Sequence, residues 1–401
     1  MLDKLIHIQN NILKSIPTGF KRYLYSQINW NSKAICITGA RGTGKTTLML
    51  QHFIDKYNDT EQCLYISADN IEVAAFGLYK IAVEYFKYGG KTIIIDEIHK
   101  YHLWQVELKN IIDAFPGKNI IVSGSSSVNL KKGKADLSRR LVYYDLKGLS
   151  FREYLQLKEN LKYNVYSIEK ILSHHISIAK DMSRHISILK YFGKYLNHGY
   201  YPFIVEGESV YLQKVLNIIE KVFYEDIAII GNMKRENILA LKKILWLIAT
   251  STPFLVNIDK LSREIGISKE YVYSYIEYLE DAGLLNGIYS EAKGFKFIRK
   301  PVKLLIENTN ILNAVSGSLN TESEKGTVRE TFFVNQVKSL YKVSYIEPGD
   351  FLVNDKYIFE IGGKNKDFEQ IRNKKNSFIV SDNIETGFGA KIPLYLFGFL
   401  Y

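Results

Sequence analysis

Three short apolar stretches in the first third of the chain predict the buried strands of a parallel sheet. They are residues 34–38, 92–95 and 119–122, each rich in isoleucine or valine. Strands of this kind are apolar on both sides because helices cover both faces of a parallel sheet. An apolar helix pattern at 48–53 follows the first strand almost at once. The pattern predicts an α/β core in which strands and helices alternate.

The rest of the chain changes pattern twice. From Ser150 to about Glu236, apolar positions recur every three or four residues, most clearly at 168–178 and 210–223, which predicts a helical region. Residues 257–289 predict a helix, a turn at Gly266, a second helix and a stop at Gly283, followed by a strand pair that ends near Arg299. Residues 349–361 predict a β-hairpin.

Length and composition limit the class of protein. The chain has 401 residues, of which 46% are hydrophobic and 24% charged, so it has room for several globular domains and is not a disordered or collagen-like chain. Its formal net charge of +11 favours contact with phosphate polymers or anionic surfaces. The many Lys, Asn, Ile and Tyr residues also indicate an A+T-rich genome, whose codon bias alone can raise the lysine content.

Two cysteines, Cys36 and Cys63, are too few for a disulfide framework, which indicates a reducing, cytoplasmic compartment. The start of the chain has no cleavable signal pattern. The apolar run at 392–401 is about half of the roughly 20 residues that a membrane-spanning helix needs, so we expect a buried final strand and no membrane association.

The first strand runs into a nucleotide-binding motif of the form G-x-x-x-x-G-K-S/T. In such a loop the glycines turn backbone N–H groups onto phosphate oxygens, the lysine adds a positive charge at the β- and γ-phosphates, and the hydroxyl ligates Mg²⁺. The motif therefore predicts binding of ATP with Mg²⁺. The expected contacts come from Gly39, Ala40, Arg41, Gly42, Thr43, Gly44, Lys45, Thr46 and Thr47.

The second strand ends in two carboxylates, Asp96 and Glu97. We expect Asp96 to join Thr46 in holding Mg²⁺, and Glu97 to orient or deprotonate the water that attacks the γ-phosphate. The alternative is that the two acids simply cap the next helix. Their position downstream of the phosphate loop favours the catalytic interpretation.

Further candidates follow the third strand. Ser123 and Ser125 either sense the γ-phosphate from a position between the loop and the acidic strand, or belong to an ordinary serine-rich turn. The basic residues Lys131, Lys132, Lys134, Arg139 and Arg140 either form a solvated loop or provide an arginine finger for a nucleotide held by a neighbouring subunit.

The runs GARGTGKTTL, IIIDEIHKYHLWQVELKNIID, IIVSGSSS and SRRLVYYDLKGLSFREYL resemble the prokaryotic predicted AAA+ ATPases that carry a winged-helix region and a nuclease-like C-terminal domain. The resemblance implies an ATPase core at 1–149, a helical lid at 150–236, a winged helix at 237–310 and a nuclease-like α/β domain at 311–401. It maps the finger-like arginine to Arg140, where Ser138-Arg139-Arg140 replaces the family's Gly-Arg pair.

The second helix of the winged-helix region has a buried stripe at Val272, Ile276 and Leu279, so Glu270, Glu277 and Asp281 are expected to lie largely on its outer side. An acidic face is poorly suited to DNA phosphates. The expected wing residues are basic and suit a DNA backbone better: Lys293, Lys296, Arg299, Lys300 and Lys303. The alternative for this module is a packing or subunit-contact role.

The C-terminal hairpin resembles the core of PD-(D/E)xK nucleases, in which acids on two strands hold Mg²⁺ and a lysine two residues beyond the second acid assists the water. Asp350 and Glu360 match the acids, and Glu330 is a possible third. Gly362 stands in place of the lysine, with Lys364 two residues later. A two-residue turn would pair Asp350 with Phe359 and send Glu360 to the opposite face, whereas a three-residue loop or a bulge would pair the two acids.

The sequence therefore predicts an ATP-hydrolysing switch or motor that acts on or with nucleic acid. Two alternatives remain open at this stage: a metal-dependent DNA nuclease gated by ATP, and a nucleotide-dependent assembly protein that binds a protein partner or further copies of itself and no nucleic acid.

Overall fold

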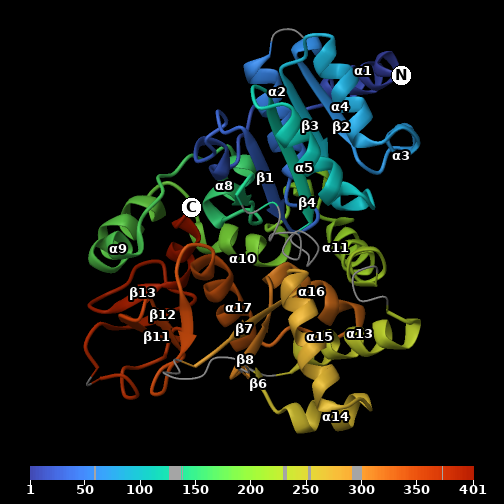
Figure 1. Ribbon diagram of the computed structural model, residues 1–401. Helices are drawn as coiled ribbons and strands as arrows, with labels where there is room; N and C mark the ends of the chain where they lie inside the picture. The colour runs from blue at the N-terminus through green and yellow to red at the C-terminus, as the bar shows by residue number, and fades with distance from the viewer. Residues whose placement is uncertain are drawn as a thin grey trace. The chain divides into compact units, whose positions relative to one another are not determined.

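The computed structural model describes residues 1–57, 60–125, 137, 139–228, 233–251, 254–290, 300–372 and 374–401. These residues form two compact units, 1–148 and 149–401 (Figure 1). The second unit contains all three segments that the sequence assigns to a lid, a winged helix and a nuclease-like domain.

The first unit is built on a five-stranded parallel sheet with the strand order β2-β3-β4-β1-β5. The strands are β1 (Ala34–Gly39), β2 (Cys63–Ser67), β3 (Thr92–Asp96), β4 (Asn119–Ser125) and β5 (Val142–Asp145). The three strands expected from the apolar runs are β1, β3 and β4. Because β4 lies between β1 and β3, the phosphate loop after β1 and the acids after β3 meet across the end of β4.

Helices cover both faces of this sheet. They are α1 (Leu2–Leu13), α2 (Lys45–Lys56), α3 (Ile71–Phe76), α4 (Leu78–Lys87) and α5 (Trp104–Ala114), with 3₁₀ turns η1 (Tyr23–Ser26), η2 (Thr60–Gln62) and η3 (Ile98–Lys100). Alternate residues of a strand lie on opposite faces of the sheet: Ile93 and Ile95 pack with α4 and α5, whereas Ile94 packs with α2. This two-sided burial explains why the strands are apolar throughout.

The second unit begins with helices and ends with a sheet. Its helices are α8 (Phe151–Glu159), α9 (Ile168–Ser183), α10 (Ile188–His198), α11 (Tyr211–Lys221), α13 (Arg235–Thr250), α14 (Ile258–Ile265), α15 (Lys269–Asp281), α16 (Thr309–Ser318) and α17 (Lys325–Lys338), with shorter turns η4 (Pro202–Glu206), η5 (Val222–Ile227) and η6 (Leu394–Phe399). The Leu-Ser-Phe-x-Glu signature forms a capping box, in which Ser150 and Glu153 each bond the other's backbone N–H at the start of α8.

Two small sheets lie within this unit. The antiparallel sheet β6-β8-β7 consists of β6 (Phe254–Leu255), β7 (Leu285–Ile288) and β8 (Lys303–Ile306). The mixed sheet β13-β12-β11-β10-β9 consists of β9 (Val343–Tyr345), β10 (Phe351–Val353), β11 (Tyr357–Gly362), β12 (Ser377–Ser381) and β13 (Lys391–Pro393). Phe333 of α17 packs on Phe351 and Phe359 of this sheet, so α17 covers one of its faces.

Two sequence expectations need correction here. The chain end is buried as expected, but it is a strand only at β13, and η6 follows at Leu394. Lys303 does not lie in an exposed wing. It belongs to β8, the central strand of its sheet, and is only 5% exposed because neighbours on both sides and an acidic partner enclose it.

Candidate functional site

The phosphate loop joins β1 to α2, and two of its glycines are required by geometry. Gly44 is the N-cap of α2 with a φ of 95°, a left-handed conformation that side-chain-bearing residues avoid. At Gly39 a Cβ atom would lie 2.4 Å from the carbonyl oxygen of Leu146, so any other residue would collide with the backbone after β5. The loop thus leads directly into a helix N-terminus, where N–H groups and the helix dipole favour anions.

Lys45 and Thr46, the first residues of α2, carry the loop's side-chain chemistry. The Lys45 ammonium donates to the carbonyl oxygens of Gly39 at 3.0 Å and Ala40 at 3.1 Å, so it lies over the loop. The Thr46 hydroxyl donates to Oδ2 of Asp96 at 2.6 Å. The structure therefore brings together the hydroxyl and the carboxylate that the sequence assigns to one metal ion.

Asp96 is the centre of the polar network at the carboxyl ends of the strands. It is 3% exposed, and its carboxylate also accepts hydrogen bonds from the Tyr65 hydroxyl at 3.0 Å, the Glu97 N–H at 3.0 Å and the Ser123 hydroxyl. Burial and the negative charge of Asp96 raise the pKa of Tyr65, which keeps this hydroxyl a neutral donor. These donors offset the cost of burying the Asp96 carboxylate.

Glu97 leaves the strand in a left-handed conformation with a φ of 50°. Because the chain turns here, Asp96 and Glu97 do not simply point to opposite faces as consecutive strand residues would. Oε2 of Glu97 lies 3.6 Å from Nε2 of His99. Left-handed backbone at a non-glycine residue costs of order 1–2 kcal/mol and is frequent at functional sites.

Ser123 and Ser125 both lie on β4 and are buried. Besides contacting Asp96, the Ser123 hydroxyl accepts the Glu97 N–H at 3.1 Å, so it links the two acids. The Ser125 backbone N–H donates to Nδ1 of His99 at 3.4 Å. The position of β4 between β1 and β3 puts these serines where a γ-phosphate sensor is expected.

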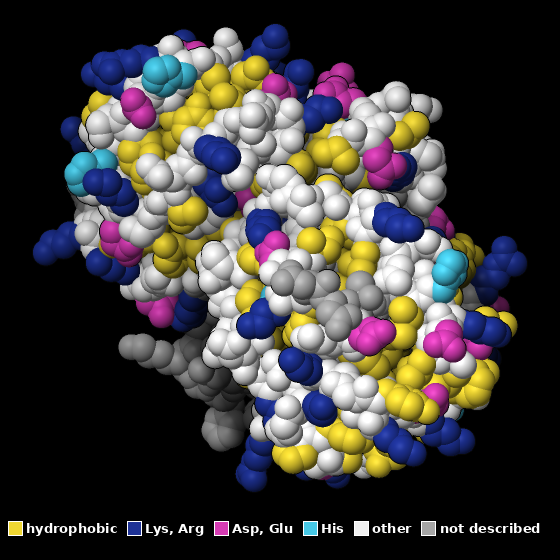
Figure 2. All heavy atoms as spheres, turned by 90° about the horizontal axis from the view of Figure 1, so that it is seen from above, with side chains coloured by type: hydrophobic (Ala, Val, Ile, Leu, Met, Phe, Trp, Pro, Cys, Tyr) yellow, Lys and Arg dark blue, Asp and Glu magenta, His cyan; other side chains and the backbone are white. Residues whose placement is uncertain are grey.

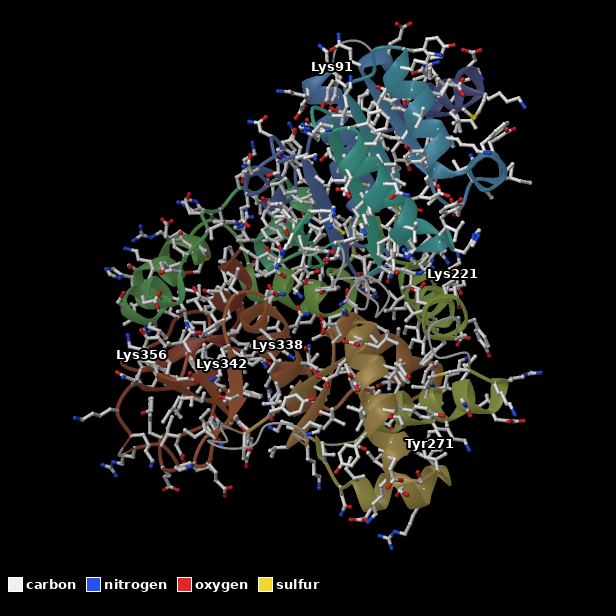
Figure 3. The ribbon with its side chains drawn as sticks, in the orientation of Figure 1. Lys91, Lys221, Tyr271, Lys338, Lys342 and Lys356 are labelled. Atoms are coloured by element: carbon white, nitrogen blue, oxygen red, sulfur yellow. The ribbon has the colours of Figure 1, made fainter. Side chains whose placement is uncertain are left out.

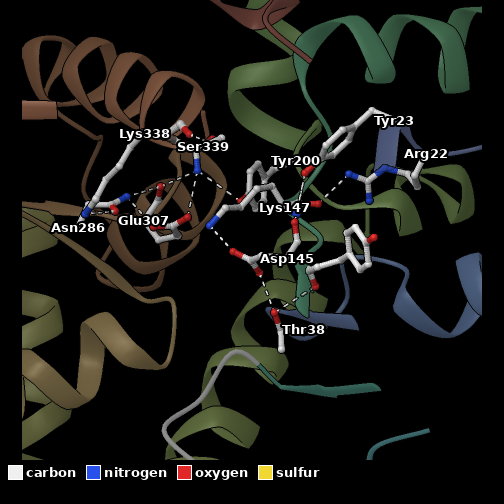
Figure 4. A network of polar contacts seen from close by, with 12 residues as sticks. Arg22, Tyr23, Thr38, Asp145, Lys147, Tyr200, Asn286, Glu307, Lys338 and Ser339 are labelled. Atoms are coloured by element: carbon white, nitrogen blue, oxygen red, sulfur yellow. Dashed lines mark hydrogen bonds and ion pairs between the residues drawn. The ribbon is translucent and has the colours of Figure 1, made fainter. Parts of the chain in front are cut away.

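Arg22 was not identified from the sequence, because nothing in its neighbourhood forms a motif. It is 6% exposed and donates to the carbonyl oxygen of Lys147 at 2.7 Å (Figure 4). It also donates to the carbonyl oxygens of Thr43 in the phosphate loop and of Gly148 at 2.8 Å. Nearby, the Thr38 hydroxyl at the end of β1 lies 3.4 Å from the Asp145 carboxylate. Arg22 therefore fixes the outer side of the loop to the segment after β5.

Arg140 is an unsuitable ligand for the nucleotide of its own subunit. Its guanidinium forms a two-pronged ion pair with Asp113, with distances of 2.8 and 2.9 Å. Asp113 lies near the end of α5, which leads to the start of β4. The pKa of Asp113 is lowered chiefly by Arg140 and to a smaller extent by Lys33, which precedes β1. Arg140 thus lies at the edge of the sheet opposite the phosphate loop. Lys131, Lys132 and Lys134 fall outside the described residues.

A second set of charged side chains lies in the C-terminal part of the second unit. The hairpin pairs Val353 with Tyr357 and Phe351 with Phe359, which is the register of the three-residue alternative. The pairing ends at Phe351, and Asp350 bonds the backbone on either side of Glu360: its N–H donates to the carbonyl oxygen of Phe359 at 3.0 Å, and its Oδ2 accepts the Ile361 N–H at 2.8 Å. Asn354 and Asp355 have positive φ values of 51° and 54°, and Lys342 bonds Asp355 at 2.7 Å (Figure 3 labels Lys342).

Two lysines neutralise this acidic cluster. Lys303 of β8 lies 2.6 Å from Oε2 of Glu330 and 3.6 Å from Oδ1 of Asp350. Lys366 forms an ion pair with Glu360. Burial raises the pKa of Glu330 to about 7, an effect that Lys303 opposes and Asp350 increases. Burial also raises the pKa of Glu360.

Each of the two acidic sites offers two side chains that could bind a metal ion. Mg²⁺ commonly uses only one or two protein carboxylates and completes its shell with water and phosphate oxygens. Asp96 with Thr46 fits this requirement, and so do Asp350 and Glu360. Across the described parts of the chain, no group of three or more His, Cys, Asp or Glu side chains is arranged to hold a metal ion. The hairpin site therefore has two candidate ligands and no complete protein cage.

Comparison with known proteins supports the class of the first unit. Residues 31–155 match the family model described as an AAA domain, and residues 189–322 match a domain of unknown function (DUF8612). The parallel sheet, the phosphate loop and the AAA match support an ATPase of the AAA type. Residues 323–401, which are most of the segment that the sequence assigns to a nuclease-like domain, lie outside both matches.

Two uncharacterized proteins of Methanocaldococcus jannaschii are similar in sequence. One is 27% identical over 289 residues and the other 28% identical over 306 residues, which is 69% and 71% of this chain. The matches cover 61% and 64% of those proteins, so the chain spans somewhat less than two thirds of the length of these relatives.

Among solved structures, a Walker-type ATPase of Pyrococcus abyssi matches with a TM-score of 0.43 and 11% identity, covering 76% of this chain and 99% of that one. AMPPCP-bound DnaA from Aquifex aeolicus matches with a TM-score of 0.24 and 13% identity, covering 69% and 88%. Both scores are too low to carry an argument. Among the described residues, no helix is long and apolar enough to cross a membrane.

Proposed function

We propose that the protein is a Mg²⁺-dependent ATPase in which Lys45 binds the β- and γ-phosphates, Thr46 and Asp96 hold the metal, and Glu97 orients the attacking water. The hydrogen bond between Thr46 and Asp96, which joins the phosphate loop to the acidic strand, is the observation that carries the proposal. A bound Mg²⁺ would neutralise phosphate charge. The chain's own contribution is to fix the phosphates at the helix N-terminus and to hold Glu97 beside Asp96 through Ser123.

Glu97→Gln tests the catalytic assignment. The amide keeps the shape of the side chain but removes its basicity, so kcat should fall at least ~100-fold while ATP affinity is retained. Lys45→Ala should instead lose ATP affinity. Steady-state hydrolysis and equilibrium binding of a fluorescent ATP analogue distinguish the two effects. Glu84→Gln on α4 is the matched control, and wild-type turnover by Glu97→Gln would refute the role given to Glu97.

We further propose that hydrolysis is coupled to nucleic acid. Two features support this idea: the net charge of +11, and two helices, α14 and α15, that meet at Gly266, whose φ is 78°, and are followed by the antiparallel strands β7 and β8, an order that we interpret as a winged helix. Glu270, Tyr271 and Glu277 are exposed on α15 (Figure 3 labels Tyr271), and this face does not suit DNA phosphates. DNA contact is therefore assigned to the wing, whose residues 291–299 lie outside the described parts. If DNA leaves the hydrolysis rate unchanged, coupling to DNA is rejected and the assembly alternative, with a protein partner or further copies of the chain, is favoured.

The hairpin register favours a second candidate function, a metal-dependent nuclease centred on Asp350 and Glu360. A two-residue turn without a bulge would have separated these acids, whereas in this hairpin Asp350 bonds the backbone of both neighbours of Glu360, Phe359 and Ile361. Asp350→Asn should abolish any cleavage of single- or double-stranded DNA in Mg²⁺ or Mn²⁺ with ATP, and should leave ATP hydrolysis unchanged. Asp355→Asn in the exposed hairpin turn is the control. Absence of cleavage by the wild-type protein would reject this candidate and leave the ATPase proposal intact.

A further inference from the structure

The side chain of Lys366 lies across Gly362, the position at which the nuclease pattern has a lysine. A Cβ atom on Gly362 would lie 2.6 Å from both Cβ and Cγ of Lys366. These distances are far below normal van der Waals contact, so the aliphatic stem of Lys366 fills the space that a side chain at 362 would use. The glycine and the displaced lysine are therefore two parts of one local arrangement.

The ammonium group of Lys366 reaches the acid that the expected lysine would accompany. It forms an ion pair with Oε1 of Glu360, a residue that is 4% exposed. The side-chain amide of Gln370 also approaches this carboxylate: with its nitrogen facing Glu360, it donates to Oε1 at 2.6 Å. Glu360 is thus held by two side chains from the turn that follows β11.

That turn is fixed from behind by a second lysine. Lys391 of β13 is 7% exposed, and its ammonium donates to the carbonyl oxygens of Lys364 at 2.6 Å and Lys366 at 2.9 Å. The Ser381 hydroxyl donates to the carbonyl oxygen of Gly363 at 2.8 Å. These bonds set the direction of the chain at 363–366, with Lys366 over Gly362 and the Lys364 side chain exposed.

We propose that Lys366, and not Lys364, supplies the lysine of the acidic site on Asp350 and Glu360. The proposal rests on the second candidate function above. In hydrolysis of a phosphodiester, a water oxygen forms a bond to phosphorus, the bond from phosphorus to the leaving sugar oxygen breaks, the leaving oxygen takes up a proton, and the water gives a proton to solvent. Lys366 contacts Glu360, so it is a positioning residue whose fixed positive charge orients that carboxylate and stabilises charge that develops beside it.

The test uses the full chain and a rescue variant. Lys366→Ala should lower DNA cleavage in Mn²⁺ by ~100-fold, whereas Lys364→Ala should stay within about twofold of wild type. Lys366→Met keeps the stem over Gly362 and removes the charge, and should lose cleavage equally. Lys366→Gly combined with Gly362→Lys removes the Cβ and Cγ atoms that would meet a side chain at 362 and puts a lysine at the expected position, so it should cleave DNA at least about tenfold faster than Lys366→Ala.

A binding measurement separates loss of the lysine charge from loss of the site. In a calorimetric titration with Mn²⁺ alone, Lys366→Ala should bind the ion at least about fivefold more tightly than wild type, because a positive charge close to the acids is removed. Lys364→Ala should bind as wild type. A Lys366→Ala protein that binds Mn²⁺ more weakly would overturn the proposal.

The two hypotheses fail differently. If the wild-type protein cleaves no substrate, the nuclease function is rejected and the role of Lys366 falls with it. If the wild type cleaves DNA and Lys364→Ala, not Lys366→Ala, abolishes cleavage, only the assignment of the lysine is wrong. If the double variant is no more active than Lys366→Ala, a lysine at position 362 cannot replace Lys366, and the proposal that Lys366 takes the place of the expected lysine is wrong.

Discussion

At the scale of single residues, Ser123 connects the two acids of the ATP site. Its hydroxyl contacts the Asp96 carboxylate and accepts the Glu97 N–H at 3.1 Å. Ser123→Ala leaves the Glu97 N–H with Asp96 as its acceptor and removes the link to β4. Both hydrogen bonds of the hydroxyl are lost, but the Glu97 N–H keeps an acceptor, so we expect kcat to fall about tenfold, or about 1.4 kcal/mol, with little change in ATP affinity.

Steady-state ATP hydrolysis with a parallel binding titration checks this prediction. Ser125→Ala is the comparison, since the contact of Ser125 with His99 comes from the backbone and survives the change. Equal losses in both variants would argue that neither serine has a specific position in catalysis and that the strand end is merely sensitive to substitution.

Glu330 gives the second unit a pH-dependent stability. Its pKa rises from 4.5 to about 7 on folding, chiefly through burial, so between these values the folded protein binds more protons than the unfolded chain. The free energy of unfolding should therefore fall as the pH rises through this interval, by at most about 3 kcal/mol from this group.

Chemical denaturation at pH 5 and 7.5 measures this effect. Glu330→Gln should lose the part of the pH dependence that belongs to Glu330, so the difference between variant and wild type should change with pH. Glu322→Gln, at an exposed position, should follow the wild-type curve. A Glu330→Gln protein with the wild-type pH slope would show that Lys303 keeps Glu330 ionised in the folded state.

At the scale of elements, local pattern predicted the strands and helices well where both faces are buried. The strand before Gly39, the strand before Asp96 and the helix after Thr46 follow from apolar runs and one motif. The hairpin register was ambiguous, because a single bulged residue decides between two pairings and the sequence around Asn354 allows both. Lys303 was misplaced because its partner, Glu330, lies 27 residues away and no local pattern indicates a buried lysine.

The hairpin turn offers a test of that register. Asp355 has a φ of 54°, which glycine adopts freely and alanine does not. Asp355→Ala should therefore lower the free energy of unfolding by about 1 kcal/mol relative to Asp355→Gly. Both variants lose the same exposed ion pair with Lys342, so the difference between their free energies of unfolding reports the cost of the backbone conformation at residue 355. Equal stabilities in urea denaturation would mean that the turn is not left-handed at Asp355.

At the scale of the whole molecule, the fold does not explain why the chain carries a net charge of +11. On the face seen in Figure 2, the described Lys and Arg side chains are interspersed with acidic and apolar ones. Several of the basic residues pair with acids: Lys303 with Glu330, Lys366 with Glu360 and Arg140 with Asp113. The Lys366 contact could not be predicted from the sequence, because the buried Lys391 that orients its turn comes from a later strand.

The net charge of +11 therefore needs a functional test. If it serves nucleic acid, DNA should stimulate ATP hydrolysis, and a complex with six or more phosphate contacts should lose about 10³-fold in affinity between roughly 50 and 200 mM salt. Rates with single- and double-stranded DNA at both salt concentrations measure this, with the DNA-free rate at each salt as the control. A turnover number that is independent of DNA but rises with protein concentration would attribute activation to assembly. That outcome would also fit the arginine-finger hypothesis for Arg140, because its ion pair with Asp113 holds it away from its own phosphate loop and leaves only the nucleotide of a neighbouring subunit as a target.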